Sequence, residues 1–256
     1  MDVSHNTALT RLLPGDNPLG NLNVRMNAAL EQLNCYGDEL SSLDLSRNNN
    51  LVFLWCNGNR LTSLDVRNKT KLTNLRCDDN RLSELKLDGC TALNRLVCSS
   101  NGLTSLNVSG CTGLETLECQ QNSLSSLNVS DCTNLKSLQL WRSGSYTSLD
   151  LRNNTALVRA NLSANNSLSS LTLGSKQNLE MLWVQNTYLS SLNISNCPVI
   201  SDAYNKGTRT DFGRYGQQID NGDWYGYKLG EGLNTGSSNP VSHCQFCVDK
   251  ETSVTA

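Results

Sequence analysis

Cysteine is the residue type in this 256-residue chain with the greatest potential for chemistry, because it occurs 11 times. A high cysteine count usually suggests disulfides, but here the spacing argues against them. Five of the cysteines are spaced evenly, one every 21 residues. This spacing predicts that they lie on neighbouring parallel strands with side chains pointing the same way, a geometry that disulfides fit poorly. We therefore expect a buried ladder of free thiols, packed as small apolar side chains. The ladder recurs every 21 residues and consists of Cys35, Cys56, Cys77, Cys98 and Cys119.

A second set of cysteines follows the same period in a different phase. Cys90, Cys111, Cys132 and Cys197 share their position in the repeat with Asn or Lys in other repeats. Because Cys alternates with residues that donate hydrogen bonds, we expect this column to combine packing with hydrogen bonding at turns. Free thiols in such number suit a reducing or anaerobic setting.

The other candidates for catalysis or metal binding are few. Cys244 and Cys247 form a C-x-x-C motif beside His243, but the sequence has no second such motif and only one other histidine. A local disulfide or two unpaired thiols therefore explains the motif better than a metal site. No phosphate-binding loop, nucleophile elbow, metalloprotease motif or dinucleotide fingerprint occurs. We expect neither enzymatic activity nor a metal or other cofactor.

The elements that carry these residues also repeat every 21 residues. In one repeat, Leu54 and Cys56 alternate with Phe53 and Trp55, as in a strand with one buried and one exposed face. Residues 61–66 alternate again and predict a second extended segment on the opposite face. An asparagine marks the turn between the two segments, where its side chain can bond the backbone of adjacent coils. These asparagines are Asn17, Asn59, Asn80, Asn101, Asn122 and Asn165, with Asp38, Ser143 and Thr187 in the same position elsewhere.

The pattern L-x-x-L-x-C-x-x-N-x-L-x-x-L-D-L resembles the 21-residue leucine-rich repeats of bacterial secreted and surface proteins, of the internalin-like or IRREKO type. It spans residues 1–197. The resemblance implies a β-rich leucine-rich repeat solenoid with parallel strands on one face, extended or short 3-10 segments on the other, and mild curvature. About nine full repeats and the start of a tenth fit this range. No capping segment precedes Met1, so we expect the chain to be part of a longer protein.

Residues 198–256 differ in composition and are expected to form a C-terminal β cap. Leucine becomes scarce there, while aromatic residues accumulate. Asn221-Gly222 lies between alternating residues and predicts a β-hairpin. Residues 246–254 predict a closing strand, and residues 230–242 the loosest loop.

Charge and hydrophobicity argue against two classes of partner. The net charge of −2 argues against nucleic acid as the main partner, because binding it would need a basic stripe. No apolar run reaches the length of a membrane-spanning helix. We expect a monomer that binds protein, with glycan as the alternative ligand. The resemblance implies a secreted or cell-surface location.

The outward-facing columns of the strands form the expected ligand-binding face. Three of the four tryptophans lie there, and interfaces are rich in Trp, Tyr, Met and Arg. Isolated exposed aromatics occur on any protein, but Phe53 and Trp55 are neighbours on one face, with Tyr36 one coil away. The residues expected on this face are Tyr36, Phe53, Trp55, Arg76, Asp78, Glu118, Gln120, Gln139, Trp141, Arg159 and Trp183.

Two adjacent repeats each gain one residue just after the strand. At the first insertion, Trp141, Arg142 and Tyr146 form either a second contact patch or a tolerated bulge. The whole pattern favours a protein-binding or adhesion module of an exported bacterial protein. The alternative is a targeting or scaffold fragment of a larger multidomain enzyme or glycan-binding protein.

Overall fold

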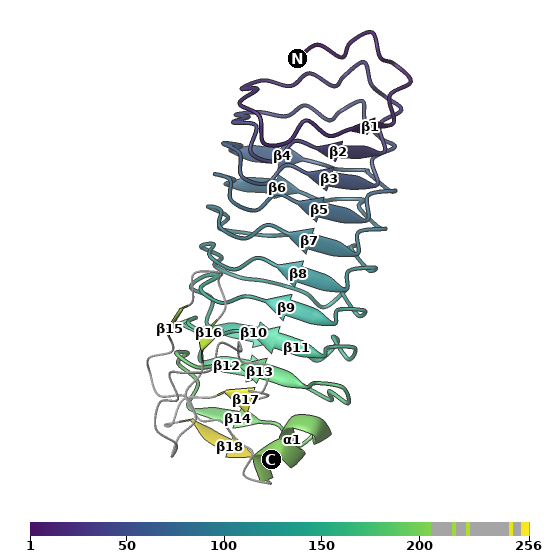
Figure 1. The fold of residues 1–256 in the computed structure, drawn as a ribbon. Helices are drawn as coiled ribbons and strands as arrows, with labels where there is room; N and C mark the ends of the chain where they lie inside the picture. Colours follow the sequence, from purple (N-terminus) through teal and green to yellow (C-terminus); the bar gives the residue numbers. More distant parts are fainter. Residues whose placement is uncertain (206–216, 219–223, 226–245, 248–251, 256) are drawn as a thin grey trace, which may run out of the picture.

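The computed structural model describes residues 1–205, 217–218, 224–225, 246–247 and 252–255. They form a parallel-strand β-solenoid, as the 21-residue period predicts (Figure 1). One face is a ten-stranded parallel sheet in which each strand pairs with the strand of the next coil. In order, its strands are β1 (Arg11–Leu12), β2 (Gln32–Asn34), β3 (Phe53–Trp55), β5 (Asn74–Arg76), β7 (Arg95–Val97), β8 (Thr116–Glu118), β9 (Ser137–Gln139), β11 (Arg159–Asn161), β13 (Met181–Trp183) and β17 (Phe246–Cys247).

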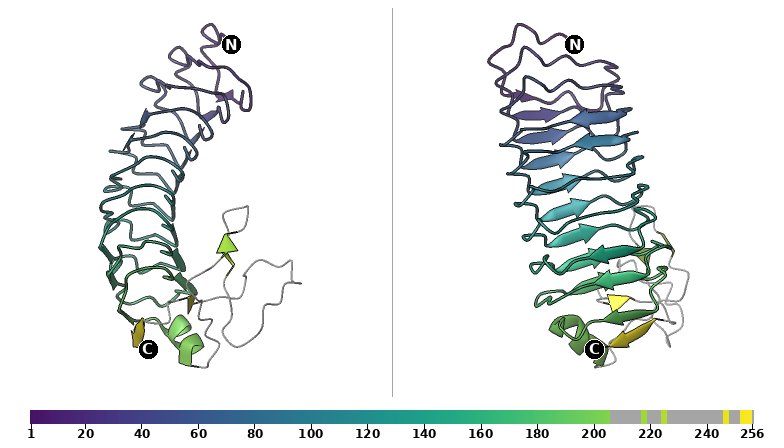
Figure 2. Two further views of the ribbon diagram at one scale, coloured as in Figure 1. Left: turned by 90° about the vertical axis from the view of Figure 1, so that its left-hand side faces the viewer. Right: turned by 180° about the vertical axis from the view of Figure 1, so that it is seen from behind.

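The opposite face carries the second extended segment of each repeat, as predicted. Three two-stranded parallel sheets lie there. The solenoid is a gentle arc, and the ten-stranded sheet lines its concave side (Figure 2). The paired strands of the convex side are β4 (Ser63–Asp65) with β6 (Glu84–Lys86), β10 (Ser148–Asp150) with β12 (Ser170–Thr172), and β14 (Ser191–Asn193) with β18 (Ser253–Thr255).

The C-terminal strands extend both faces of the solenoid. β17 pairs with β13, and β18 pairs with β14, in parallel register. The single closing strand predicted over residues 246–254 is therefore two short strands, one on each face. The predicted hairpin is confirmed as an antiparallel pair of β15 (Gln217–Gln218) and β16 (Trp224–Tyr225).

One element of this region was not predicted. Helix α1 (Pro198–Asn205) follows β14 in the chain and buries Ile200 completely. Proline is favourable in the first turn of a helix, where its missing N–H costs nothing. The C-x-x-C motif with its neighbour His243, the Asn221-Gly222 turn and the loop at 230–242 lie outside the described residues, except for the backbone of Cys247 in β17.

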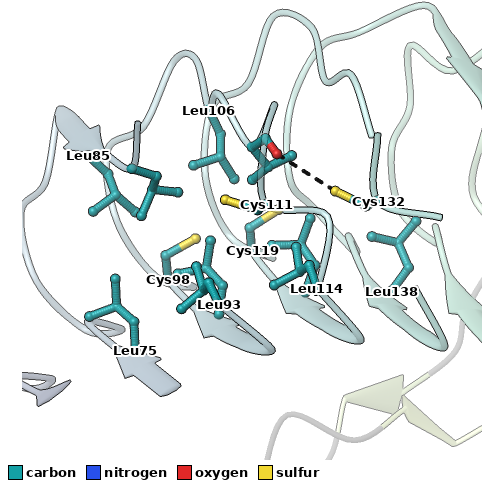
Figure 3. Packing of buried hydrophobic residues seen from close by; sticks show 14 of the residues in the cluster. Leu75, Leu85, Leu93, Cys98, Leu106, Cys111, Leu114, Cys119, Cys132 and Leu138 are labelled. Carbon is teal, nitrogen blue, oxygen red and sulfur yellow. Dashed lines mark hydrogen bonds between the residues drawn. The ribbon is translucent and has the colours of Figure 1, made fainter. Parts of the chain in front are cut away.

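The thiol ladder lies in the core, as predicted. Cys35, Cys56, Cys77, Cys98 and Cys119 each have no exposed surface, and all five are free thiols. Figure 3 shows Cys98 and Cys119 packed among leucines between the two faces. Burial raises the pKa of Cys35 to about 12 and holds the pKa of Cys56 well above its usual value. These two thiols are therefore neutral packing groups at physiological pH.

The asparagine ladder joins each coil to the one before it. The Asn101 amide donates from Nδ2 to the carbonyls of Cys98 (3.1 Å) and Cys77 (3.0 Å), in its own and the preceding coil. Its Oδ1 accepts from the Leu82 N–H at 2.9 Å. The residue before each of these positions has a positive φ, as at Gly58 (65°) and Ser100 (51°). Such a tight turn leaves backbone groups without strand partners, and the amide satisfies them.

The second column forms another hydrogen-bonded ladder, confirming the prediction of packing combined with turn bonding. Asn48 donates from Nδ2 to the carbonyl of Val24 in the preceding coil at 3.0 Å. Cys90 Sγ lies 3.1 Å from the Val66 carbonyl in the equivalent position. Lys69 is 2% exposed and donates from Nζ to the Leu45 carbonyl at 2.9 Å. Here and at Lys176, a buried ammonium thus occupies a place that neutral donors fill in other repeats.

Replacement of Lys69 by Asn should stabilise the protein by about 1 kcal/mol at pH 7, because it removes a buried charge and keeps a donor. Burial lowers the pKa of Lys69 from 10.5. The unfolded chain therefore binds more protons, and the native protein gains stability as pH rises from the lowered pKa towards 10.5. The advantage of Lys69→Asn should shrink over the same range. Denaturant unfolding at pH 7 and pH 10 measures this, with exposed Lys71→Asn as the control. If Lys69→Asn changes the free energy of unfolding by the same amount at both pH values, the side chain of Lys69 is not a buried ammonium.

Candidate functional site

The concave sheet presents its outward side chains in columns that run along the stack. Phe53 lies in register between Gln32 and Asn74, and Trp55 between Asn34 and Arg76. Neighbouring residues in a column are about 4.8 Å apart, and alternate residues along a strand about 6.6 Å. The result is a continuous face on which side chains from several coils can contact one ligand.

An aromatic cluster made of Tyr36, Phe53 and Trp55 occupies the N-terminal part of this face. The three side chains are 39%, 38% and 41% exposed. The Trp55 indole donates from Nε1 to Asn74 Oδ1 at 3.2 Å, which orients the ring. The Tyr36 ring lies against Gly15, where a Cβ atom would come within 2.5 Å of it. All three aromatic residues of this cluster are therefore exposed, and two of them, Tyr36 and Trp55, have fixed ring positions.

A groove of about 690 Å³ occupies the other part of the concave face, across β7 to β13. Of the predicted residues, it is lined by Glu118, Gln120, Gln139, Trp141, Arg159 and Trp183. The structure therefore divides the predicted face into two regions, the aromatic cluster and this groove.

Ion pairs neutralise most charges of the concave face. Arg95 contacts Glu118 at 2.5 Å, and Lys136 contacts Glu115 at 2.9 Å. The hydrogen bond from Lys136 holds the pKa of Glu115 below its usual value. Arg159 is exposed and has no ion partner within the described part of the chain. It is the lining cation that remains available to an anionic group of a ligand.

Two residues expected on the ligand-binding face are largely covered. Trp141 is 5% exposed and Asp78 is 6% exposed, so the prediction of exposed side chains is wrong for both. Both lie two residues after the last residue of their strand, β5 or β9, and directly before the turn residue with a positive φ. Arg76 contacts Asp78 at 3.3 Å and covers it further. Trp141 and Trp183 already have interaction partners within the chain.

The first one-residue insertion serves the core rather than a contact patch. Tyr146 is 2% exposed, and its hydroxyl lies 3.0 Å from Ser143 Oγ. Burial raises the pKa of this hydroxyl well above its usual value. The Ser143 N–H in turn donates to Asn165 Oδ1 at 3.0 Å. The inserted loop thus packs a tyrosine where other repeats have a smaller residue.

Eight lining residues of the groove were absent from the predicted set, among them Arg95, Lys136 and Met181. Arg95 and Met181 occupy the first outward position of their strands, which the period already marked as exposed. Lys136 precedes its strand, so alternation did not place it on this face. Among the described residues, no group of three or more His, Cys, Asp or Glu side chains is arranged to hold a metal ion. No helix in that part of the chain is long and apolar enough to cross a membrane.

No protein-family model and no curated protein matches the chain. Among solved structures, the chain is similar to the functional domain of InlJ from Listeria monocytogenes, which includes a cysteine ladder. The TM-score is 0.52 with 28% identity, over 78% of this chain and 54% of that domain. A leucine-rich repeat protein of Leptospira interrogans matches with a TM-score of 0.55 and 19% identity, over 73% of this chain and 57% of that one.

The internalin InlF of Listeria monocytogenes matches with a TM-score of 0.52 and 15% identity, over 99% of this chain and 84% of that one. The chain therefore has the leucine-rich repeat fold. It spans about half the length of the InlJ domain and of the Leptospira protein.

Proposed function

We propose that this chain is a protein-binding or adhesion module of an exported bacterial protein, and that it binds its partner on the concave sheet. The observation that carries the proposal is the in-register face itself, with exposed aromatic side chains at one end and a groove at the other. The likeness to two internalin structures supports an interaction role. The alternative, a targeting or scaffold part of a larger enzyme, predicts an appended catalytic domain in the full-length protein.

The aromatic cluster and Arg159 are the proposed contact points for the partner. Aromatic and arginine side chains contribute most often to interface energy. The remaining predicted residues, such as Gln139 and Glu118, supply polar contacts around them. The ion pairs of this face contribute little to stability, so their members are free to exchange partners on binding.

Loss of an anchor should weaken binding without affecting folding. Phe53→Ala and Trp55→Ala, and separately Arg159→Ala, should leave the melting temperature nearly unchanged, since these side chains are exposed. Truncation of each true anchor should reduce the free energy of binding by about 2 kcal/mol, roughly a 30-fold loss of affinity. The partner is first captured from a surface extract of host or neighbouring cells, and its affinity for each variant is then measured.

Exposed Tyr188 lies outside the concave sheet, and Tyr188→Ala is the matched control. If the captured partner binds all concave variants with native affinity, the concave sheet is not the binding surface. A large drop in melting temperature for Trp55→Ala would instead mean that this side chain supports the fold.

A further inference from the structure

We propose that the aromatic cluster of Tyr36, Phe53 and Trp55 is a subsite for a neutral saccharide, such as a glycan carried on the partner. The inference rests on the proposed function in one respect only, the use of the concave sheet for binding. It adds a class of ligand and confines it to β2, β3 and β5. The groove across β7 to β13 is not part of this subsite.

The first argument is the combination of flat apolar rings with fixed positions. Sugar rings present one face of C–H groups, which packs on the face of an aromatic ring. Phe53 and Trp55 are separated by one inward residue on the same strand, so the Cα atoms that carry their rings are about 6.6 Å apart. Tyr36 lies over Gly15 in the preceding coil, and Trp55 is held by Asn74. A ligand therefore meets rings that lose little conformational freedom on binding.

The second argument is the chemistry around the rings. Four of the side chains beside them are amides, namely Gln32, Asn34, Asn57 and Asn74, and all four are partly exposed. An amide both donates and accepts hydrogen bonds, which matches sugar hydroxyls that also do both.

These amides also have bonding capacity to spare. Within the described residues, the side chains of Gln32 and Asn57 make no hydrogen bond. Asn34 and Asn74 use only their Oδ1 atoms, in bonds to the Tyr36 N–H and the Trp55 indole. Their Nδ2 groups remain free to donate to a ligand.

The third argument is the absence of an unpaired charge in register with Trp55. The charged neighbour there is Arg76, and its guanidinium contacts the Asp78 carboxylate at 3.3 Å. In the groove, by contrast, Arg159 is exposed and without an ion partner in the described chain. An anionic ligand would therefore be drawn to the groove, whereas a neutral one fits the aromatic cluster.

Purified oligosaccharides test this inference directly. The probes are hexasaccharides of β-1,4-glucose, β-1,4-N-acetylglucosamine, α-1,4-glucose and mannose, with oligogalacturonate as the anionic comparison. Titration calorimetry and tryptophan fluorescence on the full chain should show micromolar to millimolar binding of at least one neutral probe. Phe53→Ala and Trp55→Ala should each weaken that binding at least tenfold. Asn57→Ala should weaken it by a smaller factor, while Tyr188→Ala should leave it unchanged.

Several results would overturn the inference. One is that no neutral probe binds at millimolar concentration, and another is that only oligogalacturonate binds. A third is that the Phe53→Ala/Trp55→Ala double variant binds a neutral probe as well as the native chain does. Dependence on Phe53 and Trp55 for a captured partner that has been stripped of glycans would assign the cluster to protein instead. None of these results removes the proposed protein binding by the concave sheet, which the partner affinities test separately.

Discussion

Replacement of Cys77 by Asp is expected to unfold the coils around this position. Cys77 has no exposed surface, and burial raises the pKa of its thiol. An aspartate would place its carboxylate in the same apolar space, and a buried charge without a partner costs about 3–5 kcal/mol. Each coil of a solenoid contacts only its neighbours, so protection should be lost first in the two adjacent coils.

Amide hydrogen exchange over residues 51–98, together with thermal melting, measures this loss. The matched control is Cys77→Val, because Val184 occupies the same column and is itself fully buried. The valine variant should keep native exchange protection, and its remaining ladder thiols should react with maleimide only after denaturation. An aspartate variant that melts like the native chain would show that position 77 does not lie in the core.

The thiol ladder could be predicted because one period governs the whole chain. A spacing of 21 residues, with Leu54 and Cys56 on the inward side of a strand, determines which side chains stack. Stacking of identical coils then puts every Cys of the column into the same apolar environment. The same reasoning anticipated the two faces of the solenoid and the role of the asparagine at each turn.

Alternation along a strand could not predict exposure at the end of the strand. Trp141 and Asp78 have the outward phase, yet both are covered, because the period does not describe how the chain bends after the last strand residue. Tyr146 shows the same limit. Its position in an inserted loop was compatible with a contact patch or a tolerated bulge, whereas the structure places its hydroxyl 3.0 Å from Ser143 Oγ inside the core.

The groove residues show a second limit, which concerns interactions between coils. Arg95 and Glu118 form an ion pair across neighbouring coils, and so do Lys136 and Glu115. Opposite charges in adjacent coils are visible in the sequence, but many pairs are possible for such flexible side chains. Arg159 could be assigned as the lining cation without an ion partner among the described residues only after the other pairs were known.

Replacement of Asn101 by Asp is expected to cost about 3 kcal/mol or more of stability. The Asn101 amide donates to three carbonyls, those of Cys77, Cys98 and Ser99, at 3.0 to 3.1 Å. A carboxylate cannot donate, so the three acceptors would lose their partner and would face a negative oxygen. Denaturant unfolding at pH 7 measures the loss. Native stability of the variant would mean that the ladder amide does not hold adjacent coils together.

The chain contains the reciprocal experiment at Asp38, which occupies the asparagine position of its own repeat. Asp38 is fully buried; its Oδ1 accepts from the Asn17 N–H at 2.9 Å, and its Oδ2 has no partner in the described chain. Burial raises the pKa of this carboxyl above 3.8, so the native chain loses stability as pH rises from 3.8 through the raised value.

Asp38→Asn restores a donor and should stabilise the protein by about 1 kcal/mol at pH 7, with the gain vanishing near pH 3. Asn101→Asp and Asp38→Asn make the same exchange of amide and carboxylate in opposite directions. If they change the free energy of unfolding at pH 7 with opposite signs, the ladder hydrogen bonds explain the effect, and not a consequence shared by any substitution at these positions. A loss of stability in Asp38→Asn at pH 7, or a gain that persists unchanged at pH 3, would contradict the model of a buried carboxylate in an amide position.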